Sequence, residues 1–165
     1  MTRYNKIRKM DISNGPGVRV SIFFQGCDFH CKGCFNTETW DFNGGKEFND
    51  EVINHVIDLC KNDVISGLSI LGGEPLNPVN IEGVTLLAKS FKEKYPNKTI
   101  WLWSGYLFDE YIHDKEIVNY VDVIVDGRFK IDLSSLTLQY KGSSNQRVID
   151  VKKSLKNNKI VLYEE

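Results

Sequence analysis

The sequence lacks the features that mark secreted, disulfide-bonded and membrane proteins. It has four cysteines in 165 residues, and three of them are clustered, which gives an odd set that does not suit a disulfide framework. Its apolar runs are far shorter than the roughly 20 residues of a membrane-spanning helix. The N-terminal segment Met1–Lys6 has no apolar targeting core. We therefore expect a cytoplasmic protein with no membrane partner, because thiols stay reduced in the cytoplasm.

The chain also lacks an excess of charge of either sign. It carries 21 Lys and Arg against 22 Asp and Glu, a net charge of −1. Proteins that bind nucleic acid through the phosphates need a basic surface, so this balance argues against a nucleic-acid partner. No linker, repeat or low-complexity stretch interrupts the sequence. The length then predicts one domain, residues 1–165, with a substantial core.

The informative feature is the cluster formed by Cys27, Cys31 and Cys34, with gaps of three and two residues. Thiolates are the ligands of iron–sulfur clusters, usually four per cluster. Three on one short loop can hold three corners of a four-iron cluster and leave the fourth iron open to a substrate. A zinc site remains an alternative, although a fourth ligand is not evident, and so does a loop of reactive thiols. Cys60 lies in an apolar helical stripe and is expected in the core.

Apolar and β-branched segments alternate with helical patterns along the chain. Strands are expected at 18–24, 68–71, 99–103, 121–125 and 159–163, and helices at 50–60 (with Asp50 as the cap), 84–91 and 109–119. Such alternation predicts parallel strands joined by crossovers. A complete eightfold barrel needs at least about 200 residues. The expected fold class is therefore α/β, a partial TIM-like barrel with a mostly parallel sheet.

Polar, glycine-bearing segments follow the expected strands. They are the cysteine loop, Gly72–Pro75, Ser104–Gly105 and Asp126–Arg128. Ligands of α/β sheets and barrels bind at the carboxyl ends of the strands. The four loops are therefore expected to meet at one site.

The cysteine triad after the first strand and Gly72–Pro75 after the second resemble the motifs of radical S-adenosylmethionine enzymes. One position departs from that family, which usually has an aromatic residue just before the third cysteine. Here that residue is Gly33, and the aromatic comes later, as Phe35. The segment Asn14–Arg19 resembles glycyl-radical-enzyme activases. Three further segments are similar to the activating proteins of anaerobic ribonucleoside-triphosphate reductases: Cys34–Trp40, Val125–Phe129 and Gly142–Arg147.

The resemblance implies a [4Fe–4S] cluster on the three cysteines and S-adenosyl-L-methionine as the second cofactor. Its reductive cleavage would give a 5′-deoxyadenosyl radical, which would generate a glycyl radical on the large reductase subunit. An electron donor such as reduced flavodoxin is implied as a further partner. The residues expected around the cofactor are Gly33, Cys34, Phe35, Gly72, Gly73, Glu74, Ser104, Asp126 and Arg128.

Several alternatives remain open from the sequence. Gly72 and Gly73 can simply form a turn, Glu74 can cap a helix, and Asp126 and Arg128 can form a surface ion pair. The segment 141–147 is either an exposed loop or a docking surface for the large subunit. Two other functions also remain: a radical enzyme acting on a small molecule, as in carboxy-deazaguanine synthesis, and a zinc-stabilised binding protein without catalysis.

Overall fold

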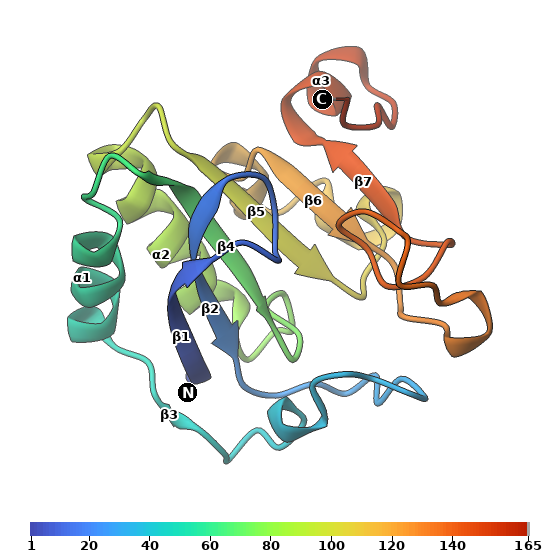
Figure 1. Ribbon diagram of the computed structural model, residues 1–165, viewed down its shortest axis with the longest axis horizontal. Helices are drawn as coiled ribbons and strands as arrows, with labels where there is room; N and C mark the ends of the chain where they lie inside the picture. Colours follow the sequence, from blue (N-terminus) through green and yellow to red (C-terminus); the bar gives the residue numbers. More distant parts are fainter. Residues whose placement is uncertain (165) are drawn as a thin grey trace.

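The computed structural model describes residues 1–164 and contains one seven-stranded sheet (Figure 1). The strand order is β3-β1-β2-β4-β5-β6-β7. The strands are β1 (Arg3–Asp11), β2 (Val18–Phe24), β3 (Lys46–Glu47), β4 (Ile65–Gly72), β5 (Thr99–Ser104), β6 (Val123–Asp126) and β7 (Arg147–Asp150). The α-helices are α1 (Asp50–Leu59), α2 (Ile81–Lys94) and α3 (Val151–Asn157).

The centre of the sheet is parallel and its edges are antiparallel. Strands β2, β4, β5 and β6 pair in parallel, whereas β1 pairs antiparallel with β2 and with β3, and β7 antiparallel with β6. The sheet does not close, because its end strands β3 and β7 do not pair with each other. The predicted α/β class and partial barrel are therefore confirmed, with the antiparallel edges as an addition.

The two faces of the sheet carry different residues because side chains alternate along each strand. One row of paired positions, Ile22, Ile70, Leu102 and Ile124, runs across the four parallel strands and joins the main core beneath α1 and α2. The opposite row, Ser21, Ser69, Trp101 and Val123, faces away from these helices. Trp101 and Val123 form a second small apolar cluster there with Val125. Parallel strands buried on both faces explain the nearly continuous apolar runs in the sequence.

The prediction of a helix at 109–119 is wrong. The chain instead makes one π-helical turn at Phe108–Ile112 and a separate 3₁₀ turn at Glu116–Asn119. Ile112 and Ile117 are both fully buried, and a spacing of five residues does not keep two side chains on one face of a continuous α-helix. The extended residue Lys115 separates the two turns and brings both isoleucines into the core.

The C-terminal elements also differ from the prediction. The strand expected at 159–163 is wrong, since this segment makes only an isolated bridge between Ile149 and Leu162. The last strand is β7, which is followed by the short helix α3, and neither was expected. The cap of α1 is Asn49, whose side chain accepts a hydrogen bond from the Val52 amide at 3.1 Å, and Asp50 is the first helical residue.

No helix within residues 1–164 is long and apolar enough to cross a membrane.

Candidate functional site

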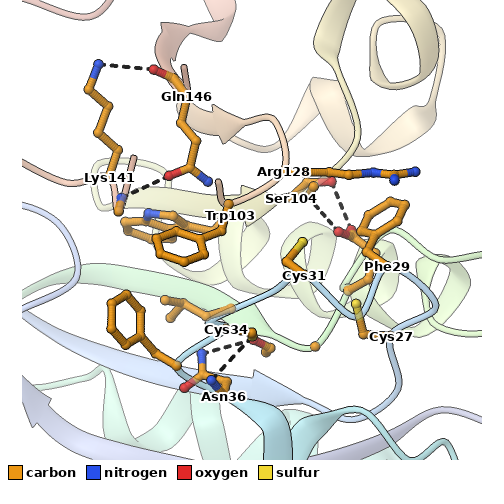
Figure 2. Close-up of a pocket in the computed structure, with 18 of the residues that line it drawn as sticks. Cys27, Phe29, Cys31, Cys34, Asn36, Trp103, Ser104, Arg128, Lys141 and Gln146 are labelled. Atoms are coloured by element: carbon orange, nitrogen blue, oxygen red, sulfur yellow. Dashed lines mark hydrogen bonds between the residues drawn. The ribbon is translucent and has the colours of Figure 1, made fainter. Parts of the chain in front are cut away.

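A cavity of about 340 Å³ lies at the carboxyl ends of the four parallel strands (Figure 2). The loops that follow β2, β4, β5 and β6 all contribute to its wall, as expected for a ligand site of an α/β sheet. Nine of the residues singled out from the sequence line it: Cys27, Cys31, Cys34, Phe35, Gly72, Gly73, Glu74, Ser104 and Arg128.

The three clustered cysteines are free thiols that face this cavity, whereas Cys60 is fully buried in the main core. Backbone amides point at their sulfurs, and the Asn36 amide donates to Cys34 Sγ at 3.4 Å. Burial raises the pKa of Cys27 and of Cys31, and hydrogen bonds from backbone amides oppose this rise. Such donors stabilise a thiolate, which is the form that binds metal.

The thiols suit an iron–sulfur cluster better than a zinc ion. Within residues 1–164, no three His, Cys, Asp or Glu side chains are arranged in metal-ligand geometry, so the sulfurs share the cavity without converging on one point. None of the described residues that line the cavity is a histidine. His30 instead stacks on the Trp40 ring, with 4.4 Å between centroids. A zinc site would lack its fourth protein ligand, while a cluster with an open iron needs only three.

The cysteine loop is fixed at its entry by backbone hydrogen bonds. The Gly26 amide donates to the Thr39 carbonyl at 2.6 Å, and the Cys27 amide donates to the Trp40 carbonyl at 3.1 Å. Gly26 has a φ of +105°, and a Cβ there would overlap the Phe42 ring. Glycine is therefore required where the chain leaves β2 and turns into the loop.

Gly72 and Gly73 let the end of β4 press against the end of β2. A Cβ on Gly72, whose φ is +152°, would overlap the Phe24 carbonyl, and a Cβ on Gly73 would lie 2.7 Å from the Gly26 carbonyl oxygen. The Gly73 amide also donates to Thr39 Oγ1 at 2.7 Å. These close contacts with protein backbone are enough to require glycine at both positions, whether or not a ligand also touches them.

Glu74 ties two of the cavity loops together. Its buried carboxylate accepts hydrogen bonds from the Leu76 amide and Ser104 Oγ, both at 2.9 Å, and from the Gly105 amide at 2.6 Å. Burial raises the pKa of Glu74 to about 7, although these hydrogen bonds act in the opposite direction. The Ser104 hydroxyl is used in the same contact, so both residues join the loop after β4 to the loop after β5.

Two of the expected residues lie outside the cavity wall. Asp126 is fully buried and accepts hydrogen bonds from the Phe108 amide at 2.8 Å and from the Arg147 guanidinium at 2.6 and 3.0 Å. Its carboxylate therefore forms an ion pair inside the protein. Gly33 has a φ of +78°, and a Cβ there would lie 2.7 Å from the Ile131 side chain. Arg128 does reach the cavity, with its guanidinium 4.3 Å from the Phe29 ring centroid.

The segment 141–147 is mostly half-buried and clamps the end of β6, so it is not simply an exposed loop. The Gln146 side chain accepts from the amides of Gly142 (2.9 Å) and Ser143 (3.1 Å) and donates to the Gly127 carbonyl at 2.9 Å. Asn145 donates to the Arg128 carbonyl, also at 2.9 Å. Lys141 and Gln146 lie across the cavity from Cys34 in Figure 2. The only signal for this part of the wall in the sequence was the similarity of Gly142–Arg147 to the activating proteins.

Apart from Phe35, the aromatic residues of the wall were not anticipated. Trp103 lines the cavity and donates from Nε1 to the Tyr140 carbonyl at 2.7 Å. Phe29 and Phe129 line it as well. Strand propensity alone explains tryptophans in β5, so nothing in the local sequence marked Trp103 as a cavity residue.

Residues 13–149 match the family model described as a 4Fe-4S single cluster domain. Three relatives carry the name anaerobic ribonucleoside-triphosphate reductase-activating protein. The protein of Enterobacteria phage T4 is 39% identical over 145 residues, 88% of this chain and 92% of the relative. The Salmonella typhi protein is 39% identical over 149 residues (88% and 97%), and the Escherichia coli K12 protein is 37% identical over 148 residues (88% and 96%). Taken with the cysteine loop at the carboxyl edge of an open, mostly parallel sheet, these matches show that the chain belongs to the family of anaerobic ribonucleoside-triphosphate reductase-activating proteins and contains a four-iron cluster domain.

Proposed function

We propose that this protein activates an anaerobic ribonucleoside-triphosphate reductase through a [4Fe–4S] cluster and S-adenosyl-L-methionine. The observation that carries the proposal is the placement of three free thiols from one short loop in a cavity at the carboxyl ends of four parallel strands. Cys27, Cys31 and Cys34 would hold the cluster and leave one iron without a protein ligand. The names of the relatives supply the reductase as the partner.

When bound, the cluster would supply the one electron that cleaves the S–C5′ bond of S-adenosylmethionine to methionine and a 5′-deoxyadenosyl radical. That radical would take a hydrogen atom from a glycine of the large reductase subunit and become 5′-deoxyadenosine. Cofactors of this kind carry the difficult chemistry, and the protein contributes binding, orientation and shielding. The amides directed at the sulfurs would stabilise the thiolate ligands. Phe29 and Trp103 would restrict water in the cavity.

The remaining residues of the wall would position the second cofactor. Gly72 and Gly73 present their backbone at the cavity surface beside the cysteine loop. Glu74 and Ser104 would hold the loops after β4 and β5 at a fixed separation. Arg128, which is cationic and exposed above Phe29, would bind an anionic group of the cofactor. Phe35, which is 70% exposed, is assigned to the cavity entrance.

The activase function is favoured over an enzyme that acts on a small molecule. Small ligands are usually largely enclosed by their sites, whereas this cavity lies in a sheet that does not close. A glycine loop of a folded partner could enter such a cavity. We place the protein in the cytoplasm because its thiols must stay reduced to bind iron, and we assign the electron to a donor such as reduced flavodoxin.

Separate alanine substitutions of Cys27, Cys31 and Cys34 test the proposal, with Cys60→Ala as the control. Each of the three should lose iron and sulfide after anaerobic reconstitution, and should form no 5′-deoxyadenosine from S-adenosylmethionine with a chemical reductant. Cys60→Ala should keep both properties, because Cys60 lies in the core. With the reductase, the unmodified protein should produce a glycyl radical visible by electron paramagnetic resonance. A fully reconstituted protein that gives no such signal with a competent reductase would contradict the assignment.

A further inference from the structure

A lobe of residues 130–142 projects from the sheet after β6. It contains one 3₁₀ turn, Ile131–Leu133, and is closed by a bridge between Ser134 and Ser143. In Figure 1 this lobe is orange and lies beside the end of the pale blue segment that carries the cysteines. The lobe supplies none of the three clustered cysteines, and its outer side chains lie away from the cavity, so those exposed side chains call for a separate explanation.

The lobe exposes large apolar side chains. Leu136 is 99% exposed, Leu133 is 43% exposed and Ile131 is 40% exposed. Phe35, on the neighbouring cysteine loop, is 70% exposed. Single exposed apolar residues are ordinary, but these four lie on two segments that meet at Gly33 and Ile131, and a concentration of this kind is typical of an interaction site. We refer to these four residues as the apolar mouth.

Side-chain contacts join the apolar mouth to the cavity. The Phe35 ring packs against the Phe129 ring with 5.2 Å between centroids, and Ile131 lies against Gly33. Phe35 and Phe129 also line the cavity, together with Leu138 from the far end of the lobe. The apolar surface therefore begins inside the cavity and continues outward onto the lobe. Gly33 has its own role here, because a side chain at that position would push the lobe away from the loop.

The charges around the apolar mouth are mainly positive. Lys32, Arg128 and Lys130 are exposed on the segments that border it, whereas the acidic residues there are Asp28 on the cysteine loop and Asp132 within the lobe. Basic residues around an apolar centre resemble the polar rim of protein–protein interfaces. Opposite charges on a partner would steer association and fix its orientation. The surface thus fits a protein segment with apolar side chains flanked by carboxylates.

We propose that the apolar mouth binds the large reductase subunit at the segment that adjoins its reactive glycine. The inference rests on the proposed function, since that function supplies the partner. It adds the place of contact: apolar side chains of the partner against Phe35, Ile131, Leu133 and Leu136, with carboxylates opposite Lys32 and Lys130. Continuity with the cavity then leads the glycine from the docking surface to the cofactor.

The test substitutes Leu136→Asp and Leu133→Asp, with Leu86→Asp as the matched control. Leu86 is 47% exposed on α2. This helix packs on one face of the sheet, and the small cluster of Trp101, Val123 and Val125 lies on the other face. Titration calorimetry without air measures the affinity for the purified large subunit. We expect each lobe variant to bind at least about tenfold more weakly, and the control to stay within about twofold of the unmodified protein. A Lys130→Glu variant should also bind more weakly and show a smaller dependence of affinity on salt concentration.

Formation of 5′-deoxyadenosine by each variant without the reductase is measured in parallel. It should be unchanged in the lobe variants, because their side chains do not line the cavity. If the unmodified protein forms no 5′-deoxyadenosine, the proposed function is contradicted. The affinities measured by calorimetry test the docking surface alone. Unchanged affinity in both lobe variants would overturn the docking proposal. A change in the protein's own oligomeric state, with unchanged affinity for the reductase, would overturn it in favour of a surface that binds a second copy.

Discussion

The two walls of the cavity are held together in different ways. The first wall consists of the cysteine loop and Gly72–Glu74. Its two parts pack backbone against backbone, as where the Glu74 amide donates to the Gly26 carbonyl at 2.8 Å, and side chains such as Thr39 and Glu74 add hydrogen bonds. The second wall consists of residues 126–147. Its contacts run through side chains, mainly those of Asn145, Gln146 and Arg147.

This difference shows two ways of building one cavity. Backbone packed against backbone leaves no space for a Cβ, so the first wall depends on glycine and responds sharply to added volume. Side-chain hydrogen bonds depend on chemical groups instead, so the second wall should respond in a graded way to the loss of donors and acceptors. The wall that carries the three clustered cysteines is the one built from backbone.

The largest expected effect comes from the same substitution made in each wall. Gly72→Ala should destabilise the protein by about 4 kcal/mol, because a positive φ and an overlap with the Phe24 carbonyl act together. Gly127→Ala should cost about 1 kcal/mol, because Gly127 also has a positive φ, +100°, but its nearest neighbour would be 3.7 Å away. Urea unfolding of the metal-free proteins measures both values. Equal losses of unfolding free energy would show that the room available for a Cβ does not distinguish the two walls.

Arg147→Met should cost about 3 kcal/mol, since it leaves the buried Asp126 carboxylate without its cationic partner. Arg147 also contacts Asp109 at 2.7 Å, but that side chain is 58% exposed. Asp109→Asn should therefore cost less than about 1 kcal/mol, and it serves as the control. Thermal unfolding of both variants checks the prediction. If the two losses were similar, burial of Asp126 would not be what makes this pair important.

The first wall should also show a dependence on pH through Glu74. Its folded pKa of about 7 lies above the ordinary value of 4.5, so the folded state binds the proton more tightly than the unfolded state. The stabilisation of the folded state by protonation of Glu74 is fully present below the unfolded pKa and is lost as pH rises through the folded pKa of about 7. Between pH 5 and pH 7 the free energy of unfolding should fall by about 2 kcal/mol from this group. Urea unfolding at several pH values should show a flatter profile in Glu74→Gln, and an identical profile would refute the assignment.

The smallest effect is expected for Gln146→Ala in the second wall. It removes the acceptor for Gly142 and Ser143 and the donor to Gly127, and water can replace part of these contacts at a half-exposed site. We expect a loss of about 1 kcal/mol. On the proposed function, the binding free energy of S-adenosylmethionine should fall by more than the free energy of unfolding, since the clamp positions the Gly127–Arg128 backbone at the cavity. A stability loss as large as that of Gly72→Ala would remove the distinction between the walls.

Much of the parallel sheet could be predicted from local patterns. β2 has the expected bounds, and β4, β5 and α2 were predicted with shorter ones, because apolar runs and helical periodicity report burial directly. The region from 108 to 119 was missed because its two turns become favourable only through contacts made elsewhere: the Phe108 amide donates to Asp126, on β6. β7 is short and polar at both ends, and one of its paired positions with β6 is the Arg147–Asp126 ion pair, which joins residues far apart in the sequence.

For the site, the sequence by itself determined the chemistry. The spacing of Cys27, Cys31 and Cys34 confines three thiols to one short loop, and Gly72–Pro75 follows the next parallel strand, so both were placed at one edge of the sheet without coordinates. The tertiary structure alone decided which nearby polar residues face the cavity. Asp126 and Arg128 are two residues apart, yet the Asp126 carboxylate is buried against Arg147, whereas the Arg128 side chain reaches the cavity. The physical reason is that ligand type and spacing are properties of the chain, whereas the direction of a side chain at a strand end is set by partners that lie far away in sequence.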